Sequence, residues 1–142
     1  MRAGAAARSS SLPPLQIMAG GTVALGSGPE VTQAREATRA NVGFYVGGMG
    51  ARDKNFYNDL FHRYGWADEA REIQDLFLSG KRDEAFSKVP DEYLDMATLC
   101  GDPAYVRDRI AVYKEVGVTY LNINVVGEDP LKVFEQVKTW AE

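Results

Sequence analysis

The sequence predicts an α/β fold in which parallel strands are covered by helices. Two segments near the end of the chain, 97–117 and 118–141, carry this prediction. Each passes from a strand through a glycine and an Asp-Pro pair into an amphipathic helix. Consecutive strand-then-helix units favour a parallel sheet with helices packed outside it. A length of 142 residues with 45% apolar residues allows one such domain with an ordinary core.

Charge and cysteine content exclude several classes of protein. Sixteen basic and twenty acidic residues give a net charge of −4, the reverse of the basic surface of a nucleic-acid binder. One cysteine and one histidine cannot form an internal disulfide or a His/Cys zinc site. No apolar run approaches the ~18 residues of a membrane span. We therefore expect a cytoplasmic protein that binds no nucleic acid, membrane or metal.

Residues 1–14 combine Ala, Ser, Gly and Pro with two arginines and no acidic residue. This composition predicts an irregular lead-in; a targeting peptide is the alternative, but the segment is short and has no amphipathic face. Alternating apolar residues from 15 to 25 predict a strand. Gly20 and Gly21 interrupt it and indicate a bulge or a close approach of another backbone.

Residues 29–42 predict a helix, because Pro29 suits a first helical position and apolar residues recur on one face. We expect this helix to end by Gly43. Segment 43–50 holds four glycines around two aromatic residues, which is too flexible a composition for a helix interior. It predicts a loop that contacts another group.

Three short helices are expected next, at 56–64, 66–77 and 85–89. Apolar residues recur there at helical spacing, and Gly65, Gly80 and Pro90 mark the ends. Their aromatic side chains are expected to form a core. Acidic pairs at 68–69, 83–84 and 91–92 lie in first helical turns, where they complement the helix dipole.

The last third of the chain contains the clearest strand, 118–126, in which Leu121, Ile123 and Val125 alternate with Asn122 and Asn124. A shorter strand is expected at 97–100. Each strand is followed by a helix that begins at an Asp-Pro pair. We expect both aspartates to cap these helices, and both prolines to occupy positions that need no N–H donor.

The common chemical motifs are absent. Val31 stands where a dinucleotide-binding motif needs its third glycine, and Met49 stands where a phosphate-binding loop needs lysine. No nucleophile elbow is present. Cys100 is expected to be a packed thiol and His62 a surface or packed side chain. No catalytic acid, base or nucleophile can be named.

One local group of residues has ligand-contact chemistry. Arg52, Lys54 and Asn55 follow the glycine-rich segment and lie between Tyr45 and Tyr57. An ordinary loop between helices is the equal alternative.

Five motifs in order carry a resemblance to a known family. They are Y-V-G-G-M-G-A-R-D-K-N-F-Y (45–57), R-Y-G-W (63–66), I-Q-D-L-F-L-S-G-K-R-D-E-A (73–85), V-P-D-E (89–92) and L-C-G-D-P (99–103). Together they resemble the carboxyl-terminal part of the luciferase-like monooxygenase superfamily. Within it, the chain is most similar to deazaflavin-dependent oxidoreductases, the relatives of methylenetetrahydromethanopterin reductase. The resemblance extends over residues 15–142.

The resemblance implies the carboxyl-terminal portion of a TIM (β/α)8 barrel with a helical insertion. Residues 15–25 would form a late barrel strand, 29–96 the insertion and 97–142 the last β/α units. Hydride would pass between a deazaflavin coenzyme or FMN and a small organic substrate. Such a barrel takes ~250 residues, so we expect the chain to be inactive without the remaining units.

The family also implies where a substrate would bind, because segment 45–55 matches an insertion over the substrate end of the barrel. The expected substrate-binding residues are the polar contacts and apolar walls Arg52, Lys54, Asn55, Tyr45 and Met49. Asn122 and Asn124 would face the barrel interior if the apolar residues between them pack on the outer helices.

A non-catalytic role is the alternative. A β/α module with an open barrel face exposes strand edges and apolar surface, which favour association. Such a module would dimerise or dock on a partner through that face, and we expect a homo-oligomer.

Overall fold

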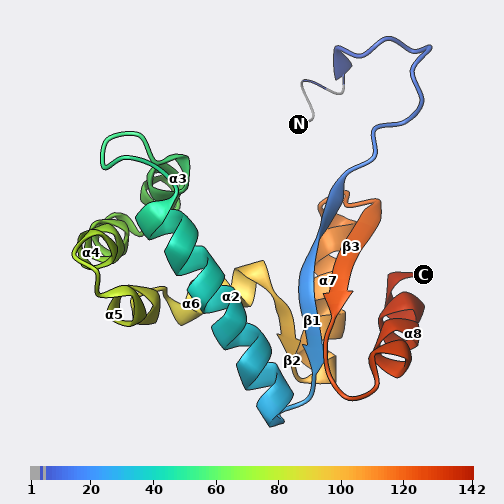
Figure 1. The fold of residues 1–142 in the computed structure, drawn as a ribbon. Coiled ribbons are helices and arrows are strands. Elements are labelled where there is room, and N and C mark those ends of the chain that lie inside the picture. Colours follow the sequence, from blue (N-terminus) through green and yellow to red (C-terminus); the bar gives the residue numbers. More distant parts are fainter. Residues whose placement is uncertain (1–3, 5) are drawn as a thin grey trace.

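The computed structural model describes residue 4 and residues 6–142. In chain order the elements are β1 (Met18–Leu25), α2 (Pro29–Gly48), α3 (Phe56–Arg63), α4 (Ala67–Leu78), α5 (Arg82–Ser87), α6 (Asp91–Ala97), β2 (Leu99–Gly101), α7 (Pro103–Glu115), β3 (Tyr120–Val125) and α8 (Pro130–Ala141). Figure 1 shows the sheet with α7 and α8 at one end of the molecule and α3–α5 around the far end of α2. Part of the expected lead-in, residues 1–3 and 5, lies outside the described residues.

The three strands form a parallel sheet, as expected, in the order β2-β1-β3. Central β1 pairs with β3 from Met18 to Val23 and with β2 from Val23 to Leu25. Consecutive strands of a (β/α)8 barrel would place β2 in the middle, so the observed order differs from the one the resemblance implies. The connections β1-to-β2 and β2-to-β3 run in opposite directions. Right-handed crossovers then place their helices on opposite faces of the sheet.

Alternate residues of the strands pack against these two helical layers. Val23 and Leu99 face α7 and α8, whereas Ala24 and Cys100 face the first turns of α2. A separate core lies among the insertion helices and is built from Val46, Phe61, Ala70, Ile73, Ala85, Val89 and Leu94. The chain therefore folds as two packed regions that share the long helix α2.

The expectation of a loop at 43–50 is wrong, because α2 continues as a helix to Gly48. Its glycines are used for close helix packing. A Cβ on Gly43 would lie 2.5 Å from Phe86 Cδ1, and a Cβ on Gly47 would lie 2.6 Å from Phe77 Cβ. Neither distance leaves room for a side chain, so the glycines let α4 and α5 approach the α2 backbone.

Gly20 and Gly21 allow a close backbone approach, which was one of the two expectations for them. A Cβ on Gly20 would lie 2.0 Å from the Asn122 carbonyl oxygen, and one on Gly21 would lie 2.7 Å from that of Ala97. Pairing with β3 runs through both positions without an extra residue, so β1 has no bulge there.

The Asp-Pro helix starts are confirmed as caps. Asp102 accepts a hydrogen bond from the Ala104 N–H at 2.8 Å, and Asp129 accepts one from the Lys132 N–H at 3.1 Å. Helix α6 begins at Asp91, which agrees with the expected placement of Asp91 and Glu92 in a first helical turn. It is a short helix in which Leu94 alone is buried.

Candidate functional site

The three parallel strands finish at one edge of the sheet, where each ends at or is followed by a glycine with positive φ. These are Gly26 (115°), Gly101 (152°) and Gly127 (129°). The Gly26 N–H donates to the Gly101 carbonyl at 2.8 Å, which holds two of these turns together. Helices α2, α7 and α8 all begin at this edge. Glycine backbone that is exposed at Gly127 and partly exposed at Gly26 and Gly101 thus lies where three helix starts converge.

A crevice lies at this edge between the start of α2 and the turn after β3. One hollow of about 550 Å³ is lined by Pro29, Glu30, Gln33, Ala34, Ala37, Val126, Gly127 and Glu128. An adjoining hollow of about 410 Å³ shares several of these residues and extends toward Lys132 on α8. After β1 the chain continues into α2 on one face of the sheet, and after β3 it continues into α8 on the opposite face. In open α/β sheets this is the position where ligands bind.

The charges lining the crevice are mainly negative. Glu30, Glu128 and Asp129 line the two hollows together with one cation, Lys132. Helix α2 begins at Gly28 without a side-chain cap, whereas aspartates cap α7 and α8. The volume is sufficient for a flat organic ring, but three carboxylates disfavour a phosphate-bearing tail such as that of FMN. These residues therefore do not fit a complete phosphorylated cofactor.

The sequence holds two local signals that indicate this crevice only when they are taken together. These signals are the Gly26-Ser27-Gly28 segment after the first strand and the Asp-Pro helix start after Gly127. In a parallel sheet such turns share one edge, because parallel strands have their carboxyl ends on the same side. The expected substrate residues lie elsewhere, since Tyr45 is sixteen residues along α2 from Pro29. At 1.5 Å per residue the separation is about 24 Å.

Asn55 is buried and its side chain is fully used within the chain. Its oxygen accepts from the backbone N–H groups of Tyr57 and Asn58 at 3.0 and 3.2 Å, which caps α3. Its amide donates to the carbonyl oxygens of Tyr45 and Val46 at 3.1 and 2.8 Å. With 1% of its surface exposed, Asn55 fixes the turn between α2 and α3 and presents no free group to a substrate.

The other expected substrate residues lie on the surface around this turn. Arg52 forms an ion pair with Asp75 on α4, which ties the turn to the insertion. Lys54 and Met49 are exposed. Tyr45 is half-buried and its ring contacts that of Tyr57 edge to face, with 4.7 Å between ring centroids.

The asparagines of β3 lie as expected from the alternation. Leu121, Ile123 and Val125 pack with α7 and α8, so Asn122 and Asn124 are exposed on the opposite sheet face. Helix α2 covers only the carboxyl end of that face. At its other end the paired residues Met18 and Tyr120 are 62% and 59% exposed.

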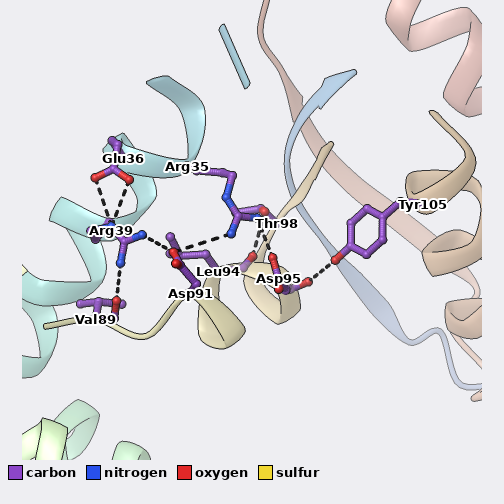
Figure 2. Close-up of polar contacts among 9 residues, drawn as sticks. All are labelled: Arg35, Glu36, Arg39, Val89, Asp91, Leu94, Asp95, Thr98 and Tyr105. Carbon is purple, nitrogen blue, oxygen red and sulfur yellow. Dashed lines mark hydrogen bonds and ion pairs between the residues drawn. The ribbon is translucent and has the colours of Figure 1, made fainter. Parts of the chain in front are cut away.

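A cluster of ion pairs joins the middle of α2 to α6, as Figure 2 shows. Arg35 Nη1 lies 2.7 Å from Asp95 Oδ1. Arg39 contacts Asp91, and its Nε lies 3.1 Å from Glu36. The hydrogen bond and charge of Arg39 hold the pKa of the Asp91 carboxyl below its usual range. Every one of these groups has a partner, so the cluster supports the fold.

The remaining candidate groups lack the properties of a reactive or metal centre. Cys100 is buried, and burial raises the pKa of its thiol, which confirms a packed side chain. Among the described residues, no three His, Cys, Asp or Glu side chains are placed to hold a metal ion. Residue 4 and residues 6–142 likewise contain no helix long and apolar enough to cross a membrane.

Comparison with known proteins adds two findings. The sequence profile described as luciferase-like monooxygenase matches residues 1–120. A Mycobacterium tuberculosis protein, whose name is that of a coenzyme F420-dependent oxidoreductase, is 39% identical over 95 residues. The match covers 64% of this chain and 27% of the relative. The chain therefore spans about a quarter of the length of this curated relative.

Proposed function

The chain belongs to the luciferase-like monooxygenase family, and from this premise we propose that it forms part of a deazaflavin- or flavin-dependent oxidoreductase. The family match over residues 1–120 is the observation that carries the proposal. The name of the M. tuberculosis relative favours a deazaflavin coenzyme over FMN. The proposed reaction is hydride transfer to or from a small organic substrate.

The crevice between β1 and β3 is the proposed place where this chain faces the reaction. A flavin or deazaflavin supplies a ring that carries hydride, and the protein supplies binding, orientation and electrostatics. Glycine backbone at Gly26, Gly28 and Gly127 permits close approach of a flat ring. Glu30, Glu128 and Asp129 make this edge unfavourable for phosphate. The phosphate is therefore proposed to bind residues outside this chain, and the chain alone to bind the coenzyme weakly.

A (β/α)8 barrel is proposed for the complete enzyme, with residues 15–142 as its carboxyl-terminal portion. Helices α7 and α8 on one face of the sheet correspond to an outer layer, and the exposed face bearing Asn122 and Asn124 corresponds to an interior. The barrel requires β2 to lie between β1 and β3. This change would break the pairing of β1 with β3 from Met18 to Val23 as well as the three-residue pairing of β1 with β2, so the proposed barrel requires a rearranged sheet.

The substrate-contact role of the turn after α2 stays a prediction. About 24 Å of helix separate Tyr45 from the crevice, so one small molecule cannot contact both places. Tyr45, Met49, Arg52 and Lys54 could contact a substrate only where other parts of the enzyme bring it to this end of α2. Asn55 acts as a helix cap in this proposal.

A chimera tests the proposed function. The aligned segment of the M. tuberculosis relative would be replaced by the corresponding residues of this chain, and binding of the deazaflavin coenzyme would be followed by its fluorescence. We expect stoichiometric binding like that of the parent protein. A chimera that is folded, with the same thermal unfolding midpoint as the parent protein, yet binds no coenzyme would contradict the proposal.

The exposed sheet face favours a second candidate function, docking of a partner or a second copy. Strands β2 and β3 are the two edges of the sheet, and Met18 and Tyr120 place apolar surface beside them. Sedimentation at low protein concentration tests this candidate. A dimer that Tyr120→Lys dissociates would support it, and a folded monomer at all concentrations would exclude self-association.

A further inference from the structure

The Glu30 side chain lies between the two glycine turns that border the crevice. A Cβ on Gly28 would lie 2.5 Å from both carboxylate oxygens of Glu30, so the carboxylate occupies the space that a side chain at position 28 would fill. A Cβ on Gly127, in the turn after β3, would lie 4.0 Å from Glu30 Cγ. Glu30 therefore lies in the gap between the start of α2 and that turn, and it lines both hollows of the crevice.

Glu30 is also the partly buried member of the acidic residues at this edge. Glu128 and Asp129 are exposed, and Asp129 is already used to cap α8, where it accepts from the Lys132 N–H. Among the described residues that line the larger hollow, Glu30 and Glu128 carry the charge and no cation is present. A charge that is partly shielded from water acts at a lower effective dielectric constant. Glu30 therefore contributes more to the potential inside the crevice than the exposed carboxylates do.

We propose that Glu30 determines the charge selectivity of the crevice: its carboxylate repels anionic groups and admits the neutral or cationic part of a ligand. Gly28 is the positioning residue, because a side chain there would displace the carboxylate from the gap. Resting on the proposed function, this selectivity orients the coenzyme. The ring end, which carries less charge, enters the crevice, and the phosphate-bearing tail stays outside.

Charged paramagnetic cosolutes measure this selectivity on the chain itself, without a coenzyme. A cationic and an anionic nitroxide of similar size, amino-PROXYL and carboxy-PROXYL, would be added separately, and the enhanced relaxation of each amide proton would be measured by NMR. The cation-to-anion ratio of the two enhancements reports the local electrostatic potential. We expect a ratio above one at the Gly28 and Gly127 amides. Glu30→Gln should lower it about threefold at both, the effect of removing a unit charge about 7 Å from the probe in ~0.1 M salt.

Two further variants separate the position of the charge from its presence. Gly28→Ala keeps the net charge but moves the carboxylate out of the gap, so it should lower the ratio at Gly127 by a smaller amount. Alanine is compatible with the backbone there, because φ of Gly28 is −76°. Glu92→Gln is the matched control, since Glu92 is exposed on α6 and lines neither hollow. It should leave both amides unchanged, and thermal unfolding would show that each variant is folded.

Three results would each overturn the proposal. An unchanged ratio at Gly127 in Glu30→Gln would mean that the carboxylate serves only the dipole of α2. An equal effect of Glu30→Gln and Glu92→Gln would mean that the net charge of the chain, and not the position of Glu30, sets the potential. An unchanged ratio at Gly127 in Gly28→Ala would contradict the placement of the carboxylate, and this result remains decisive if Glu30→Gln does not fold.

Titration with riboflavin and FMN distinguishes this proposal from the proposed function. The two molecules share one ring system and differ by a phosphate with a charge of about −1.5 to −2. Glu30→Gln should therefore raise FMN affinity relative to riboflavin affinity about threefold. If neither flavin binds although the nitroxide ratios change as expected, the proposed function fails and the charge selectivity of Glu30 is still supported.

Discussion

Replacing Gly47 with alanine tests whether the glycine-rich segment is a helix packed against α4. An alanine Cβ at this position would lie 2.6 Å from Phe77 Cβ and 2.8 Å from Phe77 Cγ. Ordinary contact between carbon atoms is about 3.5–4.0 Å. The nearest atom is attached directly to the α4 backbone, so rotation of the Phe77 ring cannot relieve the overlap and the helices must move apart.

Two effects of Gly47→Ala oppose each other. Alanine is better than glycine in a helix interior by about 1 kcal/mol. Adding atoms to a packed core costs about 1–3 kcal/mol, and the short distance to a backbone-anchored atom indicates the upper part of that range. We therefore expect the free energy of unfolding to fall by about 1–2 kcal/mol. In a loop, the same change would be neutral or stabilising where the backbone permits it.

Chemical denaturation followed by circular dichroism measures this difference. Thr32→Ala is the matched control, because Thr32 is on the exposed side of the same helix. It should change the free energy of unfolding by less than about 0.5 kcal/mol. A Gly47→Ala variant at least as stable as the wild type would refute the packing described here.

Three further predictions concern ionisation and capping. Because Arg39 lowers the pKa of Asp91, the ionised carboxylate stabilises the fold above its ordinary pKa, and this contribution is lost as pH falls through the lowered value. Asp91→Asn should therefore reduce the amount by which the free energy of unfolding falls as pH is lowered. An unchanged pH dependence would contradict the ion pair. Burial raises the pKa of the Cys100 thiol and of the Tyr93 hydroxyl, so the folded chain keeps protons that the unfolded chain releases. Stability should fall as pH rises above about 8.5, and Cys100→Ala should remove the first part of that fall, which denaturation at pH 8–10.5 would measure. Asp102→Ala should lower the free energy of unfolding by about 1 kcal/mol, whereas Asp102→Asn keeps the acceptor and should lose much less; equal losses would exclude the cap.

Local signals in the sequence predicted much of the secondary structure. Helices α3 and α4 follow from apolar spacing and from the glycines after them, and β3 follows from strict alternation. The caps at Asp102 and Asp129 depend only on neighbouring residues. All of these features are decided within a few residues of chain.

Features set by distant parts of the chain were not predicted. Glycine at 43 and 47 signals flexibility locally, but Phe86 and Phe77 lie against these positions and make a close helix contact of them. The order β2-β1-β3 depends on which strands pair, and neither Asp-Pro unit encodes that choice locally.

The candidate site likewise depends on contacts between distant residues, which local sequence patterns do not predict. Polar and aromatic residues near a glycine-rich segment predicted a substrate surface at 45–55. In the structure, the Asn55 side chain instead caps α3, and Arg52 forms an ion pair. The crevice is built from turns that are ordinary in isolation. Only the parallel pairing of β1 with β3 brings Glu30 and Gly127 to one place.

Amide NMR of the isotope-labelled chain during titration with the deazaflavin coenzyme tests the central claim most directly, with FMN as the comparison. The proposed function predicts small amide shift changes that do not reach saturation and are confined to residues 26–30 and 126–129. These changes should be larger for the deazaflavin than for FMN. Tight stoichiometric binding would contradict the view that this edge holds only part of the coenzyme. Shifts that leave the crevice unchanged would contradict its assignment as the site.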